Sequence, residues 1–132
     1  MIPERRMRVL VIDDERHITR AFWRGLHADV DVVQEHDAKA AQEMLASSDE
    51  FDVIFLDIRL NGISGLDVYQ FCVRECPARC HRIVFISADP YTPAAASLIM
   101  SVNALFMEKP FSLSDVEEMI AKFRGDPAPR GP

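Results

Sequence analysis

The stretch Val53-Ile54-Phe55-Leu56-Asp57 decides the expected fold, because an uninterrupted apolar run ends in a single carboxylate. A short run of this kind is typical of a strand that is buried on both faces, as in a parallel sheet covered by helices. Asp57 then stands at the carboxyl end of its strand. Open α/β sheets bind their ligands outside the carboxyl ends of the strands, so Asp57 is the first candidate for chemistry.

Other apolar segments have the character of strands, and they alternate with segments of helical periodicity. Besides 53–57, the predicted strands cover residues 8–12, 30–34, 83–86 and 104–107. The predicted helices cover residues 18–26, 38–46, 65–75, 93–100 and 113–123. This alternation predicts a flavodoxin-like (βα)5 fold of the α/β class, with a five-stranded parallel sheet in the order 2-1-3-4-5 and helices on both faces.

Capping residues mark the starts of three of these helices. Asp37 is expected to cap the second helix, and Thr92 followed by Pro93 predicts the start of the fourth. Ser112 precedes the last helix, and Asp115 stands three residues later in the capping-box position. These signals support the helix boundaries independently of the apolar pattern.

The composition is that of one globular domain with an acidic balance. The 132 residues predict a domain at 1–124, followed by a Pro- and Gly-rich tail or linker at 125–132. A net charge of −6 argues against direct nucleic-acid binding. No apolar run has membrane-spanning length and no signal peptide precedes the first strand, so we expect a cytoplasmic location without membrane insertion.

Three cysteines cluster in the sequence at Cys72, Cys76 and Cys80, with His81 beside them. Metal ligation is one interpretation, but the second ligand pair that zinc sites usually have is missing. Cys72 also belongs to an apolar helical stripe, where a thiol acts as a small hydrophobic group. A structural role is therefore favoured over a metal site or a disulfide framework.

Polar residues fall at the carboxyl ends of the first, third, fourth and fifth strands. They are Asp13, Asp14, Asp57, Ser87 and Lys109. Clustered carboxylates offer hard oxygen ligands that suit Mg²⁺, while an ammonium and a hydroxyl suit phosphate. Singly, the acids also suit the first turn of a helix and the lysine suits a solvated loop. Their joint placement predicts a site for a metal ion and a phosphoryl group.

At these positions the chain resembles the CheY-like response-regulator receiver domain of two-component signalling, from about residue 8 to 123. The matching residues are Asp13-Asp14, Asp57, Gly65, Ser87-Ala88 and Lys109-Pro110-Phe111. The resemblance implies that Asp57 accepts a phosphoryl group from a histidine kinase or a phosphotransfer protein. It also implies a Mg²⁺ site, with Mn²⁺ as a possible substitute, formed by Asp13, Asp14, Asp57 and the backbone carbonyl of Arg59.

The resemblance assigns further roles around the phosphoacceptor. Lys109 would pair with Asp57 and then with the phosphoryl oxygens, and Ser87 would donate a hydrogen bond to one of them. Phe106 falls at the switch-aromatic position, which links the site to a surface formed by helix 4, strand 5 and helix 5 and to a possible homodimer. The Lys109–Pro110 bond is expected to be cis.

Two residues near the phosphoacceptor are candidates for tuning the stability of the phosphoryl group. Arg59 and Asp89 occupy positions that tune the lifetime of the phosphoryl group in the family. A pair between them across the site would obstruct the hydrolytic water and lengthen that lifetime. The pattern around residues 91–93 and 108–111 is similar to receivers of hybrid histidine kinases, although a stand-alone regulator remains an alternative.

Two other functions remain as alternatives to a phosphorylation switch without enzymatic turnover. One is a pseudo-receiver that binds partners without being phosphorylated. The other is a Mg²⁺-dependent phosphatase with an aspartate nucleophile, which would require a second acid two residues after Asp57. That position is Arg59, so the sequence argues against turnover of an external substrate.

Overall fold

The structure, a computed structural model, describes residues 6–59, 65–89, 92–93, 96–97, 105–126 and 128. Five parallel strands form one sheet in the order β2-β1-β3-β4-β5, as predicted. The strands are β1 (Arg8–Ile12), β2 (Asp31–Glu35), β3 (Val53–Asp57), β4 (Ile83–Ser87) and β5 (Leu105–Glu108). The helices are α1 (Arg16–Leu26), α2 (Ala38–Ala46), α3 (Gly65–Glu75), a 3₁₀ helix (Pro77–Arg82) and α5 (Leu113–Ala121).

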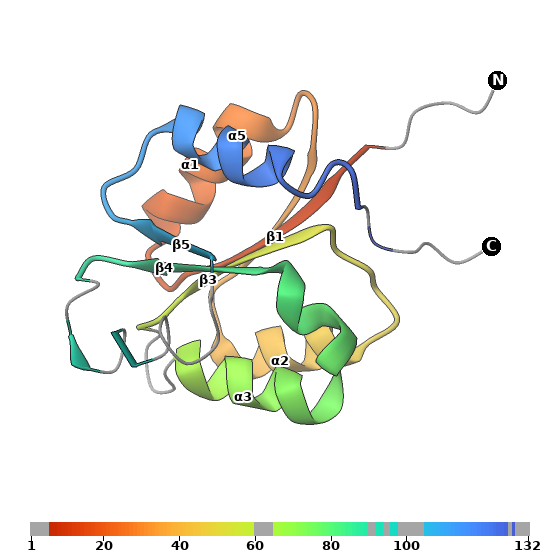
Figure 1. Ribbon diagram of the computed structural model, residues 1–132. Helices are drawn as coiled ribbons and strands as arrows, with labels where there is room; N and C mark the ends of the chain where they lie inside the picture. The colour runs from red at the N-terminus through yellow and green to blue at the C-terminus, as the bar shows by residue number, and fades with distance from the viewer. Residues whose placement is uncertain are drawn as a thin grey trace, which may run out of the picture.

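The helices cover both faces of the sheet, with α1 and α5 on one face and α2 and α3 on the other (Figure 1). All five residues of β3 are buried, and its four apolar side chains alternate between two hydrophobic clusters. Val53 and Phe55 join the cluster under α1 and α5, whereas Ile54 and Leu56 join the cluster under α2 and α3. Both faces of this strand are therefore used by the core, and only its carboxyl end meets the surface.

Element boundaries differ from the predictions by one or two residues. Residue 30 was expected to start β2, but the amide of Val30 donates to the carbonyl of Leu26 at 2.9 Å and so belongs to the turn after α1. At the other end of the chain, α5 stops at Ala121 rather than at residue 123. There the amide of Phe123 donates to the carbonyl of Ile120 at 3.0 Å, a tighter turn than an α-helix makes.

The predicted caps of α2 and α5 are confirmed. The Asp37 carboxylate accepts from the amide of Ala40 at 2.8 Å. Ser112 and Asp115 form a reciprocal capping box with hydrogen bonds of 3.1 Å and 2.9 Å. The Lys109–Pro110 peptide bond is cis, as expected.

The predicted fourth helix lies mostly outside the described residues. In its described part, the amide of Ala96 donates to the carbonyl of Thr92 at 2.9 Å. The 3₁₀ helix at Pro77–Arg82 was not predicted, because its short run of polar residues lacks an apolar period. None of the described helices combines the length and the apolar character needed to cross a membrane.

The amino ends of the strands form an edge at which buried charges bond to the backbone. Asp52 precedes β3 and is fully buried; its carboxylate accepts from the amides of Arg8 and Ala128, each at 2.7 Å. Arg82 precedes β4, is also buried, and donates to the carbonyl of Asp126 at 2.8 Å. Residues 126 and 128 therefore bond to the residues that directly precede β4 and β3, while the domain boundary at residue 124 stays a prediction.

The cysteine cluster lies at the end of α3 and in the 3₁₀ helix. Cys72 is buried in the core cluster under α2 and α3, and burial raises the pKa of its thiol. Its sulfur lies 3.2 Å from the sulfur of Cys76, and no cysteine forms a disulfide bond in the described residues. The raised pKa disfavours the thiolate that metal ions and oxidants require.

Candidate functional site

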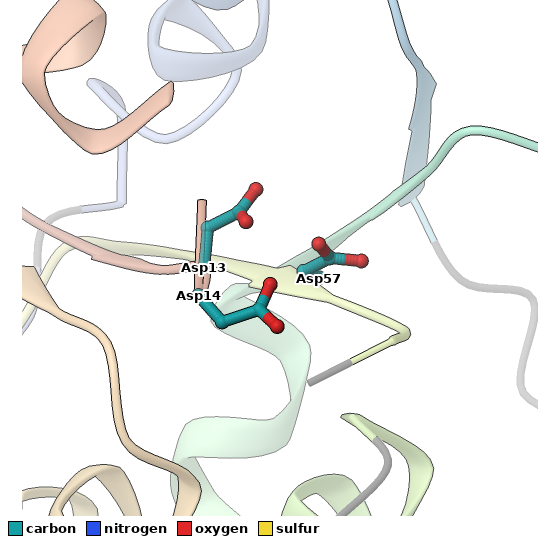
Figure 2. Close-up of side chains that lie close together, drawn as sticks. All are labelled: Asp13, Asp14 and Asp57. Atoms are coloured by element: carbon teal, nitrogen blue, oxygen red, sulfur yellow. The ribbon is translucent and has the colours of Figure 1, made fainter. Parts of the chain in front are cut away.

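Three carboxylates converge at the opposite edge of the sheet, where the strands have their carboxyl ends (Figure 2). Asp13 and Asp14 follow β1 directly, and Asp57 is the last residue of β3. One oxygen from each of the three lies within 4.8 Å of the others. Asp13 and Asp57 are buried, whereas Asp14 is exposed. The parallel sheet thus brings together acids that are more than forty residues apart in the sequence.

Lys109, which follows β5, is the cation that faces these acids. Its Nζ lies 2.8 Å from Asp13 Oδ2, 3.0 Å from Glu15 Oε2 and 3.0 Å from Asp57 Oδ2. Burial alone would lower the pKa of this lysine, but the three acidic partners outweigh that effect and raise its pKa above the usual value. Lys109 therefore remains an ammonium ion at neutral pH.

Asp13 carries an incompletely satisfied buried charge. Burial raises the pKa of Asp13 to about 6, although the Lys109 ammonium and the amide of Glu15 oppose this rise. The contact with Lys109 is short enough for an ion pair, but no donor among the described residues is aligned for a hydrogen bond to Asp13 Oδ2. A buried carboxylate oxygen without an aligned donor, beside two further acids, fits a hard divalent cation with oxygen ligands.

The carboxylate of Asp57 is held in a fixed orientation. Its Oδ1 accepts from the amide of Arg59 at 2.9 Å, and its Oδ2 accepts from Lys109 Nζ at 3.0 Å. A cavity of about 300 Å³ opens in front of it. The cavity is lined by Asp14, Glu15, Asp57, Arg59, Ser87, Ala88, Asp89 and Lys109.

The remaining predicted residues surround this cavity or lie behind it. Ser87 is the last residue of β4. Its hydroxyl oxygen accepts a hydrogen bond from the amide of Asp89 at 3.1 Å, so the hydroxyl proton can be donated to another group. Arg59 and Asp89 line the same cavity, while their role in tuning the phosphoryl lifetime stays a prediction. Phe106 is half-buried in β5, in register with Phe85 of β4.

Gly65 lets the start of α3 approach the end of β3. Its amide donates to the carbonyl of Ile58 at 2.6 Å. A Cβ atom at this position would collide with the carbonyl oxygen of Asp57 and lie 2.8 Å from the Cα of Ile58. The absence of a side chain is therefore a condition for the geometry of the Asp57 strand end.

Glu15 is a site residue that the sequence alone did not single out. It stands at the N-cap of α1, a position where an acid is common for reasons unrelated to ligand binding. The ion pair with Lys109 lowers the pKa of its carboxyl. The two residues are 94 positions apart, so only the folded chain reveals this contact.

The order of strands, the acids at two strand ends and the lysine after the last strand agree with a known family. Residues 9–121 match the family model of the response regulator receiver domain. This chain belongs to that family. Receiver domains are phosphoacceptors that work with histidine kinases or phosphotransfer proteins, and they are not enzymes in the ordinary sense.

Similar proteins include longer response regulators. The receiver domain is 31% identical over 115 residues to the alginate biosynthesis transcriptional regulatory protein AlgB of Pseudomonas putida, covering 87% of this chain and 25% of AlgB. It is 30% identical over 118 residues to the response regulator ArlR of Staphylococcus saprophyticus, covering 89% of this chain and 50% of ArlR. The chain therefore spans between a quarter and half of these relatives.

Solved receiver structures share the fold. The receiver domain of the sensor histidine kinase PA1611 from Pseudomonas aeruginosa, with a magnesium ion in its active-site cleft, superposes with a TM-score of 0.80 at 15% identity. That match covers 92% of this chain and all of the other. A CheY-like receiver from Methanospirillum hungatei gives 0.80 at 16% identity, covering 92% of this chain and 96% of the other.

Proposed function

We propose that this receiver domain is a phosphorylation-dependent switch in which Asp57 accepts a phosphoryl group from a histidine kinase or a phosphotransfer protein. The observation that carries the proposal is the convergence of Lys109, Asp13 and Asp14 on the Asp57 carboxylate beside an open cavity. Phosphoryl transfer asks a protein mainly for alignment and for neutralisation of negative charge. This arrangement offers both.

The alignment and the neutralisation of charge can each be assigned to particular groups of the chain. The amide of Arg59 and the ammonium of Lys109 hold the two oxygens of Asp57 and so orient the nucleophile toward the cavity. After transfer, Lys109 would pair with the phosphoryl oxygens, and Ser87 would donate its free proton to one of them. Each role uses a group that already borders the cavity.

A metal ion would share the charge neutralisation. Asp13, Asp14, Asp57 and the backbone carbonyl of Arg59 would hold Mg²⁺, or Mn²⁺ in its place, and the bound ion would supply positive charge opposite the phosphoryl oxygens. The unaligned buried oxygen of Asp13 supports this assignment. The magnesium ion in the cleft of the PA1611 receiver supports it by analogy.

The phosphoryl group would change a distant surface through Ser87 and Phe106. It adds a charge of about −1.5 to −2 next to β4, which would draw the Ser87 hydroxyl inward. Phe106 would rotate into the space left behind and change the surface of helix 4, β5 and α5, where a homodimer is a possible output. Arg59 and Asp89 would pair across the cavity and lengthen the phosphoryl lifetime, which removal of the Arg59 side chain would then shorten.

We also propose the bounds of the domain, the kind of protein it belongs to and its location. We assign residues 1–124 to the receiver and 125–132 to a tail or linker, from a regulator or from a hybrid histidine kinase. The expected location is the cytoplasm, without direct nucleic-acid contact by this segment, since its net charge is −6.

The test is phosphorylation of the whole chain by radiolabelled acetyl phosphate, with Mg²⁺ or with a chelator. We expect label on the wild type only with the divalent ion, no label on Asp57→Asn, and wild-type labelling of Asp29→Asn, a matched change in the turn after α1. Equal labelling of Asp57→Asn and the wild type would show that Asp57 is not the acceptor. A wild type that takes no label would instead favour the pseudo-receiver.

A further inference from the structure

We infer that Glu15 is a positioning residue that competes with the phosphoryl group for the ammonium of Lys109, and so restrains phosphorylation of Asp57. The inference rests on the proposed function of Asp57 and adds a residue to that site. It starts from one observation: Lys109 Nζ lies within 3.0 Å of three carboxylates, those of Asp13, Glu15 and Asp57.

The number of donors on a lysine limits these contacts. An ammonium ion has three N–H donors and no acceptor, and Lys109 makes hydrogen bonds to Glu15 and Asp57 and an ion pair with Asp13. A phosphoryl group on Asp57 would take over the contact of the Asp57 carboxylate, and its charge of about −1.5 to −2 and its three acceptor oxygens attract the ammonium more strongly than one carboxylate oxygen does. Asp13 and Glu15 are then the partners from which the ammonium can be drawn.

Burial decides which of these two partners is released. The side chain of Asp13 is 0% exposed, so losing the lysine would leave it as an uncompensated buried charge. The Glu15 side chain is 50% exposed and can be solvated as soon as it leaves Lys109. Glu15 makes no capping hydrogen bond with its side chain in the described residues, so its release leaves α1 intact.

Glu15 therefore opposes phosphorylation in two ways. It occupies a donor of Lys109 that the phosphoryl group needs, and it places a negative charge on the wall of the cavity that receives a negatively charged phosphodonor. Removing the charge while keeping the shape weakens both effects, since a neutral amide oxygen attracts the ammonium less than a carboxylate does. Because half-exposed ion pairs are worth up to about 1 kcal/mol, we expect Glu15→Gln to be phosphorylated up to about fivefold faster than the wild type.

The experiment compares initial rates of labelling by acetyl phosphate at saturating Mg²⁺. Glu118→Gln, on the exposed side of α5, is the matched control because it removes the same unit of charge away from the cavity lining. We expect faster labelling of Glu15→Gln and wild-type labelling of Glu118→Gln. Equal rates for Glu15→Gln and the wild type, or a slower Glu15→Gln, would overturn the inference.

A second pair of variants separates competition for Lys109 from general electrostatics. In a Lys109→Ala background there is no ammonium to release and only the charge of Glu15 on the cavity wall remains, so Glu15→Gln should give a smaller gain over that background than over the wild type. A gain of the same size in both backgrounds would also overturn the inference, since Glu15 would then act only through its charge. If the wild type labels at Asp57 and these comparisons fail, only the role of Glu15 is refuted. A wild type without label refutes the proposed function and this inference together.

Discussion

Both edges of the sheet bury a carboxylate beside a cation, but the two carboxylates are satisfied in different ways. At the amino edge, each oxygen of Asp52 accepts a backbone amide at 2.7 Å, and the buried Arg82 is bonded to backbone carbonyls. At the carboxyl edge, Asp13 shares one lysine with Glu15 and Asp57, and its Oδ2 lacks an aligned donor in the described structure.

This difference separates a structural charge from a functional one. Backbone amides cannot move away from Asp52 without unfolding the segment that carries them, so its bonds hold the start of β1 and the residues after α5 together. Asp13 and Asp57 each have one oxygen bonded to a backbone amide, while the other oxygen of each meets the shared Lys109 side chain. The contacts with that side chain can be exchanged for contacts with a ligand. A buried charge held by the backbone stabilises the fold, whereas one held by a shared side chain is available for chemistry.

The largest expected effect comes from exchanging the carboxylates at the two edges for amides. Asp52→Asn places an amide donor against a backbone donor, so we expect it to lower the free energy of unfolding by about 2 to 3 kcal/mol and to leave phosphorylation of the folded protein intact. Asp13→Asn should slow phosphorylation without destabilising the fold, because its charged form is already disfavoured by burial. Urea unfolding and acetyl phosphate labelling measure the two effects, and a destabilised Asp13→Asn that labels normally would break the comparison.

A second test uses the glycine at the phosphorylation edge. Gly65→Ala would push a Cβ atom into the backbone of Asp57 and Ile58, so we expect a loss of about 1 to 3 kcal/mol in unfolding free energy together with slower labelling. Gly25→Ala is the matched control, since there the new atom meets only the flexible side chain of Leu113 at 2.6 Å. Normal labelling of Gly65→Ala would mean that α3 can retreat without moving Asp57.

The smallest expected effect is the pH dependence of stability from His36, which follows β2 at the same edge. Partial burial and the nearby Arg16 lower the pKa of His36 below its ordinary value of 6.5, and its Nε2 lies 2.8 Å from Thr19 Oγ1. The unfolded chain then binds the proton more readily than the folded chain does. The stability that depends on a neutral His36 is therefore complete above the ordinary pKa, and it is lost as the pH falls through the lower pKa of the folded chain.

Chemical unfolding at about pH 7.5 and about pH 5.5 brackets that titration. We expect the wild type to lose slightly more stability between the two conditions than His36→Gln, because the variant lacks the titrating ring. An equal loss in both proteins would show that protonation of His36 does not oppose folding.

The sequence by itself determined the elements and the location of the site. Strand β3 could be predicted because five successive buried residues leave a pattern that survives without any partner, and Asp37 and Ser112 cap helices through bonds only three residues away. The acids and the lysine could be assigned to one edge because parallel strands place all their carboxyl ends together. The motif pattern then supplied the family.

Only the tertiary structure decided which charges are paired with which. The contacts of Glu15 with Lys109, 94 residues apart, and of Asp52 with Ala128, 76 residues apart, join segments with no local relation in the chain. A glutamate after two aspartates and an aspartate before a strand look like ordinary solvated acids in the sequence. Their partners are fixed by the strand order and by the packing of the helices, which decide where each side chain ends and how much water reaches it.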